Sequence, residues 1–196
     1  MPTKAVHLLI VPGFADWEPA HAVAELRRSG HYRTAVVGLS SEAVESMGGL
    51  KVLPDRTIAE VDPADVAVFI LPGGERWERQ PVEPELGALL STLDEAGVPL
   101  AAICAATTAI ARAGLIRGRR HTSNGLGYLR QMVPEYREDH AYVDAPAVRD
   151  GGLITASGLA DVEFAAAIMT ELAVLSDADV RLWTDLFRGG RMPSPP

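Results

Sequence analysis

The chain has 196 residues, of which 47% are hydrophobic and 22% are charged, and its formal net charge is −8. These values are typical of a globular protein that is long enough to bury about 70% of its unfolded surface. The acidic excess argues against a nucleic-acid partner, because a phosphate backbone requires a face rich in lysine and arginine. A single cysteine cannot form an intramolecular disulfide, so we expect a reducing compartment, the cytoplasm.

The sequence also argues against a membrane partner. The apolar N-terminal run ends at Pro12-Gly13 and has the pattern of a first strand rather than a signal peptide. The longest apolar stretch, over 97–116, contains Pro99 and Arg112 and changes character midway. A buried strand followed by a helix explains this stretch better than a membrane span.

Short apolar runs alternate with amphipathic segments of helix length, which is the pattern of a mostly parallel α/β sheet. In the first half we predict a strand over 5–11, a helix over 17–30, a strand over 33–39, a turn-rich excursion with one or two short strands over 40–58, and a strand over 65–74. In the second half we predict a helix over 81–97, a strand over 98–103, a short helix over 105–115, a short strand over 120–124, a helical turn over 126–134, a hairpin over 141–156 and a helix over 161–176. The pattern indicates one domain over 1–188, followed by a flexible tail over 189–196.

Three of the predicted loops leave the carboxyl ends of strands. These loops contain Glu18, the pair Gly73-Gly74, and Cys104, which directly follows its strand. Because the carboxyl ends of parallel strands share one edge of a sheet, we expect these residues to lie close together.

Cys104 has almost no loop between its strand and the next helix, so the chain must turn sharply there, as at the nucleophile elbow of hydrolases. Ala102, Ala105 and Ala106 supply the small neighbours that such a turn needs. The following helix N-terminus would then lower the thiol pKa. The alternative is a buried core thiol, since free cysteine is among the most buried residue types. The elbow context favours the reactive cysteine.

The other candidates also have structural alternatives. Gly73 and Gly74 either form only a tight turn or, with Ala105, offer backbone N–H groups to a developing oxyanion. Glu18 lies near a helix start, where an acidic residue is favoured whatever its chemistry. Trp17 and Trp77 either form the wall of a small pocket or pack at a dimer interface.

Among the five histidines, His121 is the best placed to act as a base for the cysteine, although a lone histidine in a strand is more often structural. The histidines show no metal-binding spacing, and a single cysteine argues against a structural zinc site, so we expect neither a metal nor a cofactor.

Four stretches in order, "FADWE", "FILPGG", "AAICAATTAIARAGLIRGRRHTSN" and "VRDGGLITASGLADVEFAAAI", resemble the DJ-1/ThiJ/PfpI superfamily of the class I glutamine amidotransferase-like fold. The resemblance runs from the first strand to about residue 176. It implies a flavodoxin-like sandwich with helices on both faces, usually a homodimer. Cys104 matches the reactive cysteine, Glu18 matches a protonated glutamate that hydrogen-bonds the sulfur, and Gly74 and Ala105 match the oxyanion amides.

Two positions depart from this pattern. Protease-like members carry a histidine immediately after the cysteine, where this chain has Ala105, and that removes their base. Other members place a histidine or an aromatic residue after the pair that matches Thr122-Ser123, where this chain has Asn124. Protease activity is therefore poorly supported, and Asn124 is a candidate substrate-binding residue.

Two hypotheses follow from these residues. In the first, the Cys104 thiolate attacks a small electrophilic metabolite in glyoxalase-, hydratase- or amidase-like chemistry, with Glu18 as proton donor or relay. In the second, Cys104 is the oxidised residue of a non-enzymatic stress protein, because there is no second cysteine to form a disulfide. A scaffold that has kept the fold and lost the chemistry is a third possibility.

Overall fold

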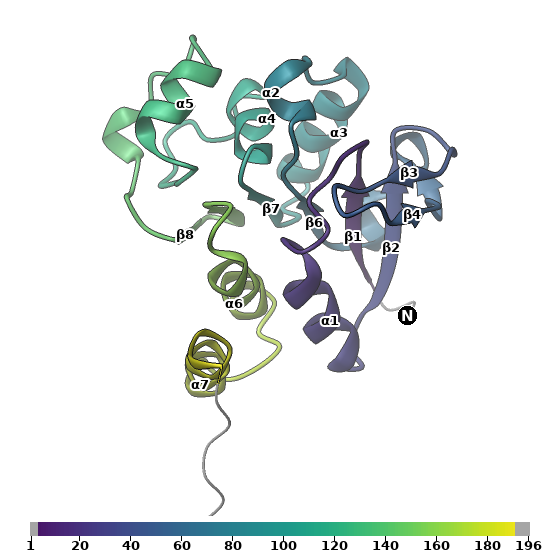
Figure 1. Cartoon of the computed structure of the whole chain (residues 1–196), viewed down its shortest axis with the longest axis vertical. Coiled ribbons are helices and arrows are strands. Elements are labelled where there is room, and N and C mark those ends of the chain that lie inside the picture. Colours follow the sequence, from purple (N-terminus) through teal and green to yellow (C-terminus); the bar gives the residue numbers. More distant parts are fainter. Residues whose placement is uncertain (1–3, 191–196) are drawn as a thin grey trace, which may run out of the picture.

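The computed structural model describes residues 4–190 and is built on a seven-stranded sheet in the order β5-β2-β1-β6-β7-β9-β8 (Figure 1). Neighbouring strands are parallel except for β8, which runs antiparallel to β9. The strands are β1 (Ala5–Ile10), β2 (Arg33–Gly38), β5 (Arg56–Thr57), β6 (Val66–Leu71), β7 (Leu100–Ile103), β8 (Ala147–Asp150) and β9 (Leu153–Ala156). A separate hairpin consists of β3 (Val44–Glu45) and β4 (Lys51–Val52). The predicted mostly parallel α/β sheet is confirmed.

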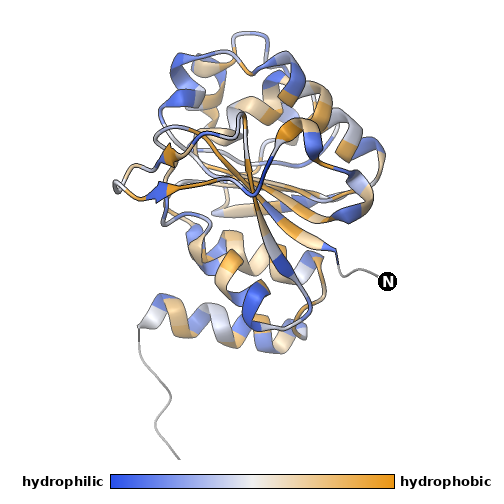
Figure 2. Ribbon diagram, turned by 90° about the vertical axis from the view of Figure 1, so that its right-hand side faces the viewer, coloured by the Kyte–Doolittle hydropathy of each residue, from blue (hydrophilic) through white to orange (hydrophobic). Residues whose placement is uncertain are grey.

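Helices cover both faces of this sheet (Figures 1 and 2). One face carries α2 (Arg76–Arg79), α3 (Pro84–Glu95), α4 (Ala106–Arg112) and α5 (Leu126–Met132). The other face carries α1 (Ala20–Arg28) and α6 (Asp161–Glu171), with α7 (Asp177–Gly189) packed on α6. Three short 3₁₀ helices span Ile58–Glu60, Pro63–Asp65 and Asp139–Ala141.

The central strand β6 shows why the sequence adopts this architecture. Its residues VAVFIL are all buried. Phe69 packs into the core under α3 and α4, whereas Val68 and Ile70 pack into the core under α1 and α6. Successive side chains of a strand point to opposite faces, so a strand covered on both sides must be apolar throughout.

Several predicted elements differ from the structure. The predicted strand over 120–124 is only an isolated bridge, in which His121 exchanges backbone hydrogen bonds with a loop at Ala141 and Val143 rather than with the main sheet. The short helix α2 and the helix α7 were not predicted. Helix α7 includes Gly189, where the predicted tail was to begin, and residues 191–196 lie outside the described residues.

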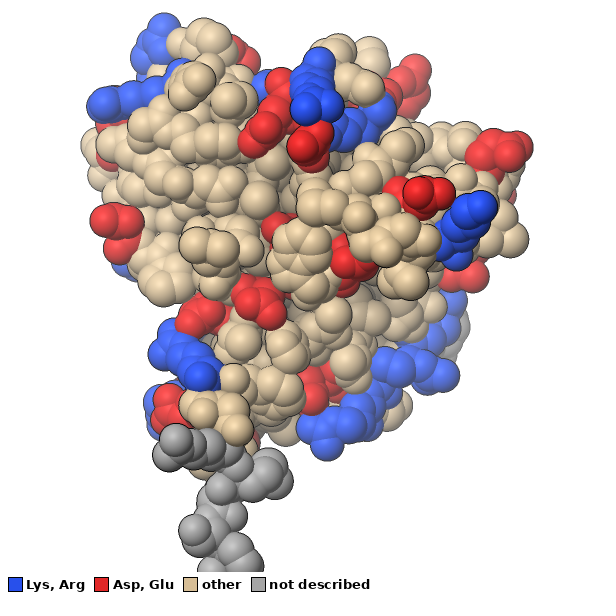
Figure 3. All heavy atoms as spheres, viewed as in Figure 1, with Lys and Arg blue, Asp and Glu red and all other residues tan. Residues whose placement is uncertain are grey.

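The surface seen in Figure 3 carries acidic and basic side chains interspersed with wide uncharged areas. Over residues 4–190, no helix is both long and apolar enough to cross a bilayer.

His7 on β1 gives the fold a specific sensitivity to acid. Its ring is fully buried, Nδ1 lies 3.1 Å from the Ala5 carbonyl oxygen, and Nε2 has no partner within residues 4–190. Burial lowers the pKa of His7 below its ordinary value of 6.5. Below that pH the unfolded chain therefore takes up a proton that the folded chain does not, and the free energy of unfolding falls.

We predict that His7→Leu reduces the loss of stability between pH 7 and pH 5. One proton of difference changes the free energy of unfolding by about 1.4 kcal/mol per pH unit, and the variant removes that contribution. Urea denaturation at several pH values measures it. The exposed His140 provides a control as His140→Gln. Equal pH dependence in the wild type and His7→Leu would contradict the prediction.

Candidate active site

The carboxyl ends of β1, β6, β7 and β9 meet at one edge of the sheet and bring four residues together. These residues are Glu18, Gly73, Cys104 and Gly158. A Cβ atom built on Gly73 would lie 2.7 Å from Cys104 Cβ and 2.7 Å from Glu18 Oε2. The convergence of the loops expected from the parallel sheet is therefore present.

Cys104 is at a strained turn between β7 and α4. Its φ is +59°, a left-handed conformation that costs a residue with a side chain about 1–3 kcal/mol. Hydrogen bonds on both sides hold this turn in place. Cys104 N–H donates to the Ala156 carbonyl on β9 (2.9 Å), and the Cys104 carbonyl accepts from the Thr107 hydroxyl (2.6 Å). The Thr107 hydroxyl is also 2.6 Å from that of Ser123. This geometry is that of the expected elbow.

Two glycines pack against the cysteine from opposite loops. Gly73 approaches Cys104 Cβ and the Glu18 carboxyl, as described above. A Cβ atom on Gly158 would lie 2.6 Å from Cys104 Sγ. Neither position has room for a side chain. Gly158 was not singled out from the sequence, because nothing in its loop shows that the loop folds over the sulfur.

The Glu18 carboxyl is almost fully buried beside the sulfur. Its Oε2 accepts a 2.5 Å hydrogen bond from Gly73 N–H, and the carboxyl also hydrogen-bonds Cys104. Burial raises the pKa of Glu18, and the nearby charge of Asp161 adds to this. The carboxylate is therefore more basic than an ordinary glutamate, which suits it to exchange a proton with its neighbour.

The Cys104 thiol differs from the sequence expectation. Burial raises its pKa to about 11, and the negative charge of Glu18 acts in the same direction. The side chain of Asn124 and the backbone N–H of Ala105 oppose this rise by donating toward the sulfur. The expected lowering of the thiol pKa by the helix N-terminus is thus outweighed, because the sulfur sits under Gly158 and next to an acid.

Asn124 is the polar side chain that approaches the sulfur from the segment after α4. Its Nδ2 lies 3.4 Å from Cys104 Sγ, and its Oδ1 accepts a 2.9 Å hydrogen bond from Gly158 N–H. The amide orientation follows from these partners, since the oxygen is already bound to a donor. Asn124 therefore contacts the reacting atom itself.

The expected oxyanion amides are not equivalent. Gly73 N–H is bound to Glu18 and is not free for a substrate. Within residues 4–190, the N–H groups of Gly74 and Ala105 have no backbone acceptor. Gly74 has a φ of +149°, and a Cβ atom there would lie 2.8 Å from the Gly13 carbonyl oxygen, so only glycine fits. The Gly74 N–H therefore suits an incoming oxygen, whereas the Ala105 N–H donates toward the Cys104 sulfur.

His121 is not placed as the base. Its Nδ1 lies 2.8 Å from the Arg119 carbonyl oxygen and its Nε2 lies 2.8 Å from the Tyr136 hydroxyl. Both ring nitrogens are thus occupied away from the cysteine, and the ring is buried. This is the structural role that a lone histidine more often has.

Trp77 also differs from both roles considered for it. It is buried in the protomer core, and its Nε1–H donates to the Pro72 carbonyl at 2.9 Å, which holds the Gly73-Gly74 loop. Trp17, in contrast, is 48% exposed.

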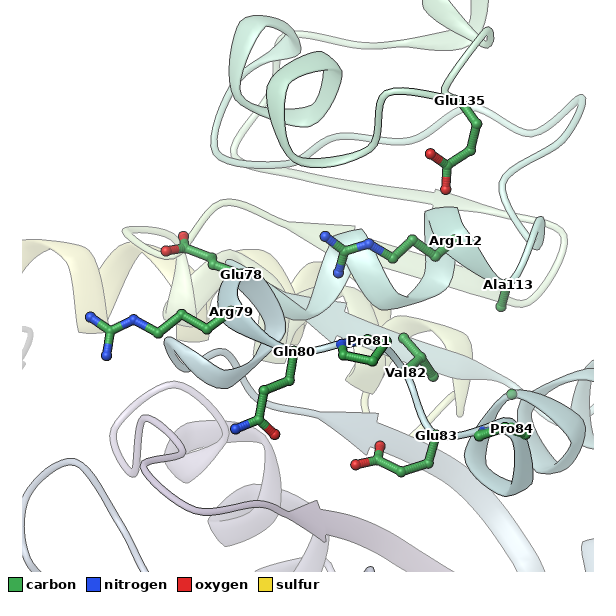
Figure 4. Close-up of a pocket in the computed structure, with 11 residues that line it drawn as sticks. Glu78, Arg79, Gln80, Pro81, Val82, Glu83, Pro84, Arg112, Ala113 and Glu135 are labelled. Atoms are coloured by element: carbon green, nitrogen blue, oxygen red, sulfur yellow. The ribbon is translucent and has the colours of Figure 1, made fainter.

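A cavity of about 520 Å³ is lined by residues of α2, of the segment that joins α2 to α3, and of α4, together with Glu135 (Figure 4). Arg112 lines it and holds its walls together by donating to the Trp77 and Met132 carbonyls. Cys104 is not among its lining residues, but Glu78 is, and the Tyr128 hydroxyl donates to Glu78 at 2.8 Å. Neither Glu78 nor Tyr128 was predicted from the sequence, which has no pattern linking α2 to α5.

Known proteins are similar to this chain over most of its length. Residues 4–171 match the model of the DJ-1/PfpI family. The chain is 35% identical over 197 residues to a Bacillus subtilis protein named uncharacterized protease YoaZ, covering 95% of this chain and 91% of that protein. It is 27% identical over 150 residues to a Thermococcus kodakarensis protein named deglycase TK1284, covering 76% of this chain and 87% of that protein.

A solved structure shows the same fold. The crystal structure of the DJ-1 superfamily protein Atu0886 from Agrobacterium tumefaciens superposes with a TM-score of 0.87 at 33% identity. The match covers 96% of this chain and 100% of that chain.

We predict that Gly158→Ala lowers the free energy of unfolding by about 1–3 kcal/mol, because the added methyl group overlaps the sulfur. Thermal and urea denaturation measure this effect. Gly127→Ala is the matched control, since a Cβ atom there meets nothing within 4 Å and alanine in α5 should raise stability by up to about 1 kcal/mol. Equal effects of the two substitutions would show that the space above the sulfur is not restricted.

We also predict that Glu18→Gln lowers the pKa of the Cys104 thiol from about 11, because it removes the adjacent negative charge while keeping an acceptor for Gly73 N–H. The ultraviolet absorbance of the thiolate, followed against pH, measures this shift. A thiol pKa that stays the same or rises in Glu18→Gln would contradict the electrostatic account.

Proposed function

Because this chain belongs to the DJ-1/PfpI family, we propose that it is a cysteine-dependent enzyme acting on a small electrophilic metabolite, with glyoxalase-, hydratase- or amidase-like chemistry. The observation that carries the proposal is the hydrogen bond between the buried Glu18 carboxyl and the sulfur of an elbow cysteine. An acid held against a nucleophile in this way provides a path for its proton. Relatives named as a deglycase and a protease support catalysis as the family's role.

The reaction begins with the transfer of the thiol proton. As Cys104 Sγ forms a bond to the electrophilic carbon, its proton passes to the Glu18 carboxylate. Burial also raises the pKa of Glu18, so its carboxylate is a better proton acceptor than that of an exposed glutamate. The Cys104–Glu18 pair thus holds one proton and one negative charge throughout.

The substrate oxygen receives the electron pair of its double bond. In the proposed complex, the N–H of Gly74, which has no backbone acceptor within the described residues, donates to this oxyanion, and the N–H of Ala105, which donates toward the sulfur in the free protein, is shared with it. Glu18 then returns its proton to the oxygen, or to a leaving nitrogen in an amidase-like reaction. Ala105 offers no side-chain base, and this favours small activated substrates over peptide bonds, whose amine leaving group needs a strong proton donor.

Exposed apolar residues next to the site support a homodimer. Leu159, which directly follows Gly158, is 96% exposed, and Trp17 and Leu50 are 48% and 58% exposed. Leu50 also lines a mostly apolar groove of about 510 Å³ against α1. We propose that a second copy of the chain covers these side chains and completes the wall of the site.

The redox-sensing alternative uses the same cysteine but needs a readily ionised, accessible thiol. The raised pKa of the half-buried thiol weighs against this alternative, whereas the proposed enzyme has Glu18 in contact with the sulfur as an acceptor for the thiol proton.

Turnover of a panel of small dicarbonyls, isonitriles and amides tests the proposal. We expect Cys104→Ala to abolish turnover and Glu18→Gln to reduce it by about 100-fold or more, because the proton path is lost. Glu25→Gln, which only removes a surface pair with Arg28, is the control. If the wild type turns over no member of the panel while peroxide converts Cys104 cleanly to sulfinate, the redox function replaces the proposed one.

A further inference from the structure

A chain of polar contacts leads away from the sulfur, on different elements from Glu18. Asn124 Nδ2 donates to Cys104 Sγ, and Asn124 Oδ1 accepts from Gly158 N–H. The Tyr128 hydroxyl, one helical turn further along, also contacts the Asn124 side chain and donates to Glu78 Oε1 at 2.8 Å. The contacts therefore run from Glu78 on α2 through Tyr128 on α5 to the cysteine.

The direction of each hydrogen bond in this series follows from Glu78, the acceptor at its far end. A carboxylate has no proton to donate, so Glu78 accepts the hydrogen bond, and the Tyr128 hydroxyl donates its only proton to it. The Tyr128 oxygen is then left with lone pairs alone toward Asn124. It accepts the second N–H of the Asn124 amide, which agrees with the effect of Asn124 on the phenol, namely to favour its ionised form.

The Asn124 amide is consequently held at both of its ends. Its oxygen is bound by the Gly158 N–H and its nitrogen faces two acceptors, Tyr128 and the sulfur. Rotation of the amide by half a turn would place its oxygen against the sulfur and against an oxygen that has no proton to offer. Both contacts would be repulsive.

We propose, building on the proposed function, that Tyr128 and Glu78 are positioning residues that keep the Asn124 amide turned with its N–H groups toward Cys104. They act through Asn124 and do not themselves touch the reacting atoms. The oriented Asn124 amide stabilises negative charge on the sulfur, as a protonated histidine would. Unlike a histidine, it cannot take up a proton.

The acidic groups near the sulfur lie on other elements than Asn124 and Tyr128. Glu18 approaches on the loop after β1, and Asp161 at the start of α6 acts on Glu18. The negative charge of Glu18 opposes the ionisation of Cys104. The Asn124 side chain and the Ala105 N–H are the groups that favour ionisation, so the direction of the amide has a direct effect on the thiol.

The rate of alkylation of Cys104 by iodoacetamide, measured from pH 6 to pH 11, tests the proposal without requiring turnover. We expect Tyr128→Phe to move the alkylation profile to higher pH and to lower the rate near neutral pH by about fivefold, the value of one hydrogen bond. Asn124→Leu should have an effect at least as large. In the Asn124→Leu background, Tyr128→Phe should have no further effect, because the residue through which it acts is gone.

Matched controls separate positioning from general damage. Tyr142→Phe removes a phenol whose hydroxyl lies 3.5 Å from the Ser123 carbonyl oxygen, and Glu75→Gln removes an acid of the same segment that pairs with Arg79. Both should leave the alkylation profile unchanged. Thermal denaturation and circular dichroism establish that each variant is folded. If Tyr128→Phe does not fold, Glu78→Ala replaces it, since it frees the phenol proton to turn toward Asn124.

The outcomes are distinct. An unchanged profile in Tyr128→Phe, or in Glu78→Ala where it replaces it, overturns the proposal. So does a shift that persists in full when Asn124 is already leucine. A shift that depends on Asn124, in a protein that turns over no substrate, supports the positioning role while removing the proposed function.

Discussion

Cys104 has a φ of +59° at the end of a buried strand, and a residue with a side chain adopts this conformation only where its surroundings compensate the strain. The compensation comes from separate elements. Strand β9 accepts the Cys104 N–H, and Thr107 donates to its carbonyl. The turn lifts the sulfur out of the sheet into the space between the loops, where Glu18 and Asn124 reach it. The chemistry of the site depends on this single strained residue.

Burial controls the charge of the site. The sulfur and the Glu18 carboxyl both lose solvent, and burial raises the pKa of each. Two adjacent anions in such a place would be strongly unfavourable, so the pair is stable with one proton between them. This explains how a thiol that is protonated at rest can belong to a nucleophilic site, because the acceptor for its proton is already in contact with it.

The polar groups around the pair divide the work of stabilising negative charge. The Gly73 N–H donates to the Glu18 carboxyl, whereas the Asn124 side chain and the Ala105 N–H donate toward the Cys104 sulfur. A histidine in place of Ala105 or Asn124 would combine donation with proton uptake. In this chain an alanine and an amide stand there instead, so Glu18 is left as the proton carrier, and the direction of the Asn124 amide becomes important.

The sequence by itself determined most of the succession of strands and helices, apart from α2, α7 and the segment 120–124. It also determined the elbow at Cys104 and the convergence of Glu18 and Gly73 upon it, because apolar periodicity and parallel topology are local or follow from simple geometry. Tertiary structure alone decided the rest. Three contacts join segments with no shared sequence pattern: Gly158 packs on the Cys104 sulfur, Tyr128 donates to Glu78, and His121 contacts the Tyr136 hydroxyl. Tertiary structure also decides the pKa of Cys104. Burial raises this pKa by more than the helix N-terminus lowers it, and burial depends on packing rather than on neighbours in the sequence.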